Sequence, residues 1–206
     1  MSRNKDQNEQ MRAMSRQKIL STAQRLIAER GYDGCSVSDI ARQAGMSQGN
    51  IYWYFASKEE ILKTILLEGF ATLGSAMAEA AADTDTGVEK LDTFLRGFDA
   101  LMRDKSGEEF LTIVMTLIAQ GGAERFAEFG LSTQQIGAGY HRSLDAILAQ
   151  GQAEGTIMPG IAPRLLSAFF FSFINGLAMM YPEEWREFPP EAIHQAALRL
   201  MGRIVT

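Results

Sequence analysis

The sequence predicts an all-α protein with a small N-terminal domain and a larger C-terminal helical domain. Apolar residues recur with helical spacing through most of the 206 residues, as is typical of amphipathic helices. The five prolines lie after residue 158, so long helices can run uninterrupted before that point. Two short helices joined by a tight turn, within residues 36–55, mark the N-terminal domain.

These two short helices have clear start and stop signals. Ser36 is a favourable N-cap, and Asp39 stands three residues later in the capping-box position. Gly45 is placed to end the first helix in the left-handed conformation, and Ser47 is placed to cap the second. The first helix has one apolar face, formed by Val37, Ile40, Ala41 and Ala44.

The second short helix has an outward face suited to a nucleic acid. Ile51 and Phe55 lie one turn apart and face inward. The side chains that then face outward are Gln48, Gly49, Asn50, Tyr52, Trp53 and Tyr54. Amide side chains pair bidentately with adenine in the major groove, and tyrosine hydroxyls reach phosphates. The alternative is a packing unit that buries this face against a later domain, but such burial would leave several polar groups unsatisfied.

We therefore predict a helix-turn-helix whose second helix enters the major groove of DNA. Ser57 caps a third helix, and Lys58 in its first turn is expected to point toward the same surface and contact phosphate. The charge distribution agrees, because the chain up to Phe55 has eight basic and five acidic residues, whereas the remainder is acidic. The predicted DNA-binding residues are Ser36, Ser38, Ser47, Gln48, Gly49, Asn50, Tyr52, Trp53, Tyr54 and Lys58.

The sequence of this N-terminal region resembles that of a known family. The run G-Y-D-G-C-S-V-S-D-I-A-R-Q-A-G-M-S-Q-G-N-I-Y-W-Y-F-A-S-K-E-E-I-L, with the helix before it, resembles the DNA-binding domain of TetR-family transcriptional regulators. The resemblance implies a homodimeric repressor that binds a palindromic double-stranded operator and is released by a small apolar or amphipathic effector. It also implies that the last two helices pair across a two-fold axis as a four-helix bundle. Activation instead of repression, and a regulator without a small ligand, remain open.

The domain organisation follows from the motif and the helical pattern. We expect a flexible N-terminal arm over residues 1–14, and a helix-turn-helix DNA-binding domain over 15–57 that begins with a helix from about Ser15 to Arg30. A helical effector-binding and dimerisation domain follows over 58–206. Its helices are predicted over 58–82, 88–103, 108–120, 123–150 with a break near Gly130, 163–181 and 190–204.

The stretch over 163–181 is apolar on nearly all sides. It is shorter than the roughly 20 apolar residues of a transmembrane helix, and a helix that is apolar all round is otherwise buried. Successive helix positions are about 100° apart, so its phenylalanines cannot all enter one core, and we expect a second copy of the chain to cover the others. The predicted dimer interface comprises Leu166, Phe169, Phe170, Phe173, Ile193, Leu200 and Met201.

The middle helices are rich in Phe and Met, which line adaptable apolar pockets but also fill ordinary cores. With the resemblance, this composition predicts an effector site among Phe70, Phe94, Phe98, Met102, Ile113, Leu117, Tyr140, His141 and Asn175. An all-helical enzyme is the weaker alternative, because the two histidines stand in no metal-binding spacing and no catalytic motif occurs. No catalytic residue, metal, cofactor or membrane partner is expected. The polar N-terminus and the single Cys35 favour a cytoplasmic protein without a signal peptide.

Overall fold

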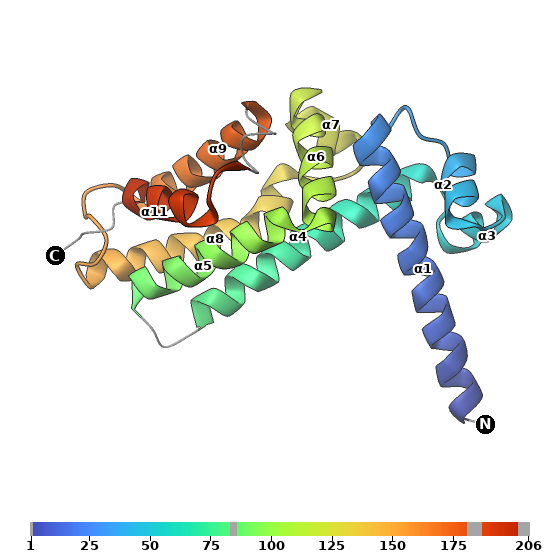
Figure 1. The fold of residues 1–206 in the computed structure, drawn as a ribbon, viewed down its shortest axis with the longest axis horizontal. Helices are drawn as coiled ribbons and strands as arrows, with labels where there is room; N and C mark the ends of the chain where they lie inside the picture. Colours follow the sequence, from blue (N-terminus) through green and yellow to red (C-terminus); the bar gives the residue numbers. More distant parts are fainter. Residues whose placement is uncertain (1, 83–85, 181–186, 202–206) are drawn as a thin grey trace. The chain divides into compact units, whose positions relative to one another are not determined.

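The structure, a computed structural model, describes residues 2–82, 86–180 and 187–201 (Figure 1). The described elements are α-helices, which confirms the predicted all-α class. The chain divides into two compact units. Unit 1 combines Met1–Gly69 with Lys105–Ser132, and unit 2 combines Phe70–Asp104 with Thr133–Thr206.

Unit 1 is organised around its first helix. It contains α1 (Ser2–Arg30), α2 (Val37–Ala44), α3 (Gln48–Tyr54), the first part of α4 (Lys58–Ala82), α6 (Lys105–Ala119) and α7 (Ala123–Glu128). Helix α1 packs against both α2 and α6, and α3 packs against α2. Its largest fully buried side chains are Ile19, Leu26, Ile40, Ile51, Ile61, Leu62, Leu66 and Leu117. This core fixes the two short helices to α1.

The predicted flexible arm over residues 1–14 requires correction, because α1 begins at Ser2. Residues 2–14 contain no proline or glycine and consist mostly of residues with good helix propensity. The C-terminal half of α1 is anchored in the core by side chains such as Ile19 and Leu26. Adding residues to a helix that is already nucleated is far easier than starting one, so the helix continues through the exposed N-terminal segment.

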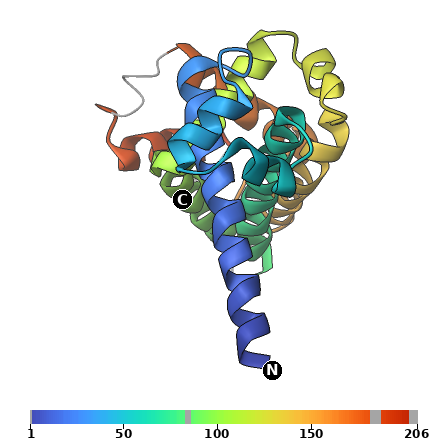
Figure 2. The same ribbon diagram turned by 90° about the vertical axis from the view of Figure 1, so that its right-hand side faces the viewer.

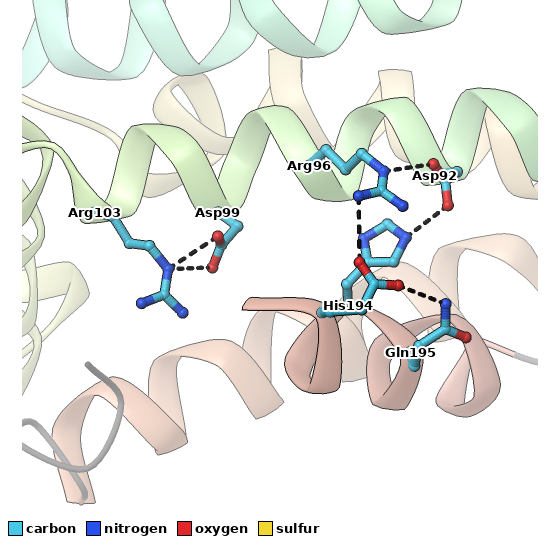
Figure 3. Close-up of polar contacts among 7 residues, drawn as sticks. Asp92, Arg96, Asp99, Arg103, His194 and Gln195 are labelled. Atoms are coloured by element: carbon cyan, nitrogen blue, oxygen red, sulfur yellow. Dashed lines mark hydrogen bonds and ion pairs between the residues drawn. The ribbon is translucent and has the colours of Figure 1, made fainter. Parts of the chain in front are cut away.

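Among its described residues, unit 2 holds the rest of α4 together with α5 (Gly87–Arg103), α8 (Thr133–Ala153), α9 (Pro163–Met180) and α11 (Pro190–Leu200). Helix α8 packs against α5 and α9, and α11 packs against α5. Figure 3 shows the polar side chains between α5 and α11, where Arg96 of α5 reaches Glu191 of α11 at 3.4 Å. Further along α5, Arg103 Nε donates to both carboxylate oxygens of Asp99 at 2.9 Å.

The predicted helices beyond residue 58 are found with shifts of a few residues. The break near Gly130 is confirmed, since Gly130 has φ +63° between α7 and α8. The last helix ends at Leu200, and residues 202–204 of the predicted range lie outside the described residues. The division at Gly69 differs from the predicted boundary at residue 58, because α6 buries Ile113 and Leu117 in unit 1, where α1 packs against it.

Candidate DNA-binding surface

The start of α2 is fixed by a reciprocal pair of hydrogen bonds. The backbone N–H of Asp39 donates to Ser36 Oγ at 3.1 Å, and the backbone N–H of Ser36 donates to Asp39 Oδ2 at 3.1 Å. This is the predicted capping box. The hydrogen bonds from the Ser36 side chain and backbone lower the pKa of Asp39, so its carboxylate remains charged at the positive end of the helix.

The turn between α2 and α3 has the conformation that the glycine predicts. Gly45 has φ +65°, and the N–H of Met46 donates to the Ala41 carbonyl at 2.9 Å, as in a Schellman motif. Ser47 then caps α3 by accepting a hydrogen bond from the Asn50 N–H at 3.1 Å. The four predicted apolar residues of α2 are buried. These local signals set the path of the chain into α3.

Helix α3 is anchored by its apolar side and exposes the opposite one. Ile51 and Phe55 are buried, as predicted. Gln48, Gly49, Asn50 and Tyr52 are exposed, and the Trp53 side chain is 60% exposed. Tyr54 differs from the prediction because it is half-buried, with its ring edge-on to Trp53 at a centroid distance of 4.6 Å.

The predicted serines of this surface differ in how their hydroxyl groups are used. Ser36, Ser38 and Ser47 are all exposed. The hydroxyls of Ser36 and Ser47 cap helices, and the Ser36 hydroxyl also donates to the Asp39 carboxylate. The hydroxyls of Ser36 and Ser47 would therefore have to contact phosphate while they also cap helices. Ser38 has no capping role.

The structure gives Lys58 a different role from the predicted phosphate contact. Its Nζ donates to the carbonyl oxygens of Tyr32 and Cys35, at 2.7 and 2.8 Å. The same ammonium lies 3.9 Å from the centroid of the Tyr32 ring. These contacts direct the lysine into the loop between α1 and α2. Lys58 therefore closes this loop, and its ammonium is directed away from the role of a phosphate contact.

One basic residue of the predicted flexible arm lies beside α3, a contact that the sequence does not predict. The guanidinium carbon of Arg12, on α1, lies 4.8 Å from the centroid of the Trp53 ring. The predicted flexible arm includes Arg12, and a flexible arm implies no fixed contact with α3. The only available signal was the absence of helix breakers before Ser15, which would have extended α1 and brought Arg12 into register with the core side chains.

The predicted effector residues are divided between the two units. Ile113 and Leu117 belong to the core of unit 1, whereas Phe70, Phe94, Phe98, His141 and Asn175 belong to unit 2. Met102 and Tyr140 lie outside the residues whose side chains are described. Ile113 and Leu117 are buried in the unit that carries α1–α3.

Unit 2 contains an aromatic cluster. Phe170 of α9 lies 5.6 and 5.7 Å from the ring centroids of Phe94 and Phe98 on α5. Phe171 lies beside Phe170 and also contacts His141 of α8, at 5.2 and 4.8 Å. Burial lowers the pKa of His141, and the positive charge of Arg164 lowers it further against the opposing effect of Asp145. The cluster is thus an apolar region with one weakly basic imidazole.

The predicted dimer residues divide between a buried and an exposed group. Leu166, Phe170 and Met201 are buried within unit 2, so their assignment to the interface is wrong for this arrangement of α9 and α11. Phe169 and Phe173 of α9 are 58% and 38% exposed, Leu200 of α11 is exposed, and Ile193 is half-buried. Four-residue spacing places Leu165, Phe169 and Phe173 on one side of α9, and this row is the α9 stripe.

Two kinds of site are not found in the described part of the chain. No helix there is long and apolar enough to cross a membrane. Those residues also contain no group of three or more His, Cys, Asp or Glu side chains placed to hold a metal ion.

Similarity to known proteins extends over most of the chain. Residues 19–65 match the sequence model of the family described as "Bacterial regulatory proteins, tetR family". Over 183 residues the chain is 30% identical to the fatty acid metabolism regulator protein of Bacillus subtilis (strain 168), and this alignment covers 89% of the chain and 91% of that relative.

Two solved structures have a similar fold. One is the transcriptional regulator FadR from Bacillus subtilis in complex with stearoyl-CoA, with a TM-score of 0.74 and 28% identity over 92% of this chain and 99% of that chain. The other is the fatty acid degradation regulator FadR from Bacillus halodurans, with a TM-score of 0.76 and 21% identity over 91% and 94% of the two chains. The second likeness concerns the fold alone.

Proposed function

Because the chain belongs to the tetR family of bacterial regulatory proteins, we propose that it is a transcriptional repressor that a small effector releases from its operator. The observation that carries this proposal is the exposed amide and aromatic face of α3, held outward by the buried Ile51 and Phe55. Such a regulator acts in the cytoplasm, on the chromosome. Its relatives are transcriptional regulators, not enzymes.

On DNA, we propose that α3 lies in the major groove and reads bases through Gln48 and Asn50. Gly49 between them has no side chain, which allows the helix to approach the groove closely. Ser38 and Tyr52 are proposed to contact phosphates and so to fix the register of the helix, together with the capping serines Ser36 and Ser47.

We also propose that the functional form is a homodimer on a palindromic operator. The α9 stripe and Leu200 support this proposal, since exposed apolar rows of this kind mark interfaces. A two-fold pair covers the same stripe on both copies. Two recognition helices would then enter major grooves about 34–36 Å apart or a multiple of that distance.

For the effector, we propose a fatty acyl thioester of coenzyme A. The structure of Bacillus subtilis FadR in complex with stearoyl-CoA supports this class of ligand, as does the similarity to the fatty acid metabolism regulator protein of the same organism. A long acyl chain requires an apolar lining, which the aromatic side chains of unit 2 are suited to supply, with Phe70, Phe94 and Phe98 as proposed contacts. His141 and Asn175 are proposed as polar contacts. The effector acts only through its higher affinity for the DNA-incompetent state.

One experiment tests both operator binding and release by the effector. An operator is first selected from random DNA with the purified protein, and its affinity is measured by fluorescence anisotropy. Stearoyl-CoA, stearate and coenzyme A are then added separately at equal concentration. Release by stearoyl-CoA but by neither of its parts supports the acyl thioester. Operator binding that none of the three changes would refute this effector class, and failure to select any sequence would refute the repressor itself.

A further inference from the structure

The N-terminal half of α1 continues past α2 and α3 and ends away from the rest of unit 1 (Figures 1 and 2). Arg12 lies in this half, with its guanidinium over the Trp53 ring. Trp53 belongs to the outward face of α3. We propose that Arg12 is a phosphate-binding residue and that Trp53 holds it in position. The inference rests on the proposed function, because it requires that α3 meets DNA.

Three other basic residues near α3, Arg16, Arg42 and Lys58, are already engaged. Arg16 Nη1 lies 2.8 Å from Glu68 Oε1, and Arg42 pairs with Asp39 on its own helix. Lys58 is bound by the carbonyl oxygens of the loop. Arg12, by contrast, forms no ion pair with any residue that the structure describes. It is therefore an uncompensated positive charge that directly contacts the recognition helix.

The chemistry of the contact leaves the hydrogen-bond donors of Arg12 available. A guanidinium stacked on an aromatic ring uses its planar face, whereas its N–H groups lie in the plane and point outward. Tryptophan is the strongest aromatic partner for such a cation. Two parallel N–H groups match the two oxygens of a phosphate, and this geometry makes arginine a preferred phosphate ligand.

Trp53 accordingly acts as a positioning residue. An arginine on an exposed helix samples many rotamers, and the loss of that freedom on binding reduces affinity. Stacking on Trp53 restricts the side chain before DNA arrives, which removes part of this loss. This positioning role also accounts for the exposure of the large Trp53 indole. The amides beside it on α3 are the groups proposed to read bases.

The first test compares Arg12→Ala with Arg142→Ala, which removes the same charge from an exposed position on α8 of unit 2. Dissociation constants for the selected operator and for random duplex DNA are measured over a series of salt concentrations. Loss of one phosphate contact lowers the slope of log K against log salt by about one unit. We expect this decrease for Arg12→Ala on both DNAs, and a wild-type slope for Arg142→Ala.

The second test asks whether Trp53 acts by holding Arg12 or by contacting DNA itself. Trp53→Leu, Arg12→Ala and the double variant form a double-mutant cycle for operator affinity. If Trp53 acts by holding Arg12, Trp53→Leu weakens binding in the wild-type background and has little further effect once Arg12 is absent. Trp53→Phe, which keeps an aromatic ring, should retain most of the affinity. Arg12→Lys should retain the salt slope but lose the benefit of the planar stack.

Three results would overturn the inference. An unchanged salt slope in Arg12→Ala, with sequence-specific binding intact in the wild type, would exclude the phosphate contact and leave the proposed function standing. Losses that multiply independently in the cycle would exclude the supporting role of Trp53. A wild-type protein that selects no DNA sequence would remove the proposed function, and this inference with it. Far-ultraviolet circular dichroism of each variant verifies that the total helix content is unchanged.

Discussion

His194 Nε2 on α11 lies 2.6 Å from Asp92 Oδ1 on α5 (Figure 3). The imidazole is buried, and its hydrogen on Nε2 faces a carboxylate that also accepts a hydrogen bond from Arg96 at 2.9 Å. Burial opposes ionisation of Asp92, but the hydrogen bonds from Arg96 and His194 outweigh it and lower the pKa of the carboxyl. This contact fixes α11 to α5.

Asp92→Asn should therefore weaken the attachment of α11. A hydrogen bond to a charged group contributes about 1.5–3 kcal/mol, and the partial exposure of Asp92 favours the lower end of that range. Because the folded-state pKa is lowered, the contribution is present above the unfolded value of about 3.9 and is lost as the pH falls through the folded-state pKa. Urea unfolding at pH 7 and below pH 4 measures both effects.

The matched control is Glu79→Gln, which neutralises an exposed carboxylate on α4 in unit 2. It should leave the free energy of unfolding nearly unchanged. A loss of stability in Asp92→Asn that persists undiminished at low pH would show that the carboxylate charge is not what holds α11.

Asn50→Ala and Gln48→Ala test base readout by α3. Each should weaken operator binding by about 1–3 kcal/mol if the amide pairs bidentately with a base, and should barely affect random DNA. Gln120→Ala serves as the control, because it removes an exposed amide that follows α6 and does not belong to α3. Fluorescence anisotropy with both DNAs provides the measurement. Equal losses on operator and random DNA would count against readout by these residues.

Lys58→Met tests the loop contact. The substitution removes two hydrogen bonds to carbonyl oxygens and the contact with Tyr32, so the free energy of unfolding should fall by about 2 kcal/mol or more. The salt slope of DNA binding should stay at the wild-type value when measured well below the melting temperature, because no phosphate contact is lost. Lys18→Met, on the exposed side of α1, is the matched control for stability.

The opposite outcome for Lys58→Met is equally clear. A salt slope lowered by about one unit with unchanged stability would return Lys58 to the DNA-binding surface.

Substitutions at exposed and at buried phenylalanines of α9 should have different effects, the first on dimerisation and the second on stability. Phe169→Glu or Phe173→Glu places a charge on the exposed stripe and should yield folded monomers that bind a palindromic operator poorly. Phe170 is 3% exposed, and Phe170→Ala should instead cost about 3–5 kcal/mol of stability. Analytical ultracentrifugation and thermal unfolding distinguish the two effects. A wild type that sediments as a monomer at micromolar concentration would contradict the homodimer and its two-groove mechanism.

Local signals made much of the fold and part of the candidate site predictable. The caps Ser36 and Ser47 and the turn at Gly45 act on the few residues beside them, so the path from α2 to α3 follows from sequence. The same signals predicted the buried pair Ile51 and Phe55, and with it the outward face of α3.

Contacts between residues far apart in sequence were not predictable in the same way. The Lys58 ammonium is bound by carbonyl oxygens 23 and 26 residues earlier, and a capping pattern gives no information about them. Helix geometry predicts that the phenylalanines of α9 cannot all enter one core. Which of them points inward depends on the packing of α5 and α8 around Phe170. The contact of Arg12 with Trp53 depends on the extension of α1 to Ser2, which a flexible arm over residues 1–14 does not predict.

The exposed α9 stripe also bears on how gene expression would respond to the amount of this protein. If operator binding requires two copies, the concentration of binding-competent dimer rises with the square of the protomer concentration while monomers predominate. A modest fall in synthesis would then empty the operator disproportionately. Substitutions at Phe169 or Phe173 that only weaken pairing would shift this threshold, and cells could compensate for them by making more of the chain.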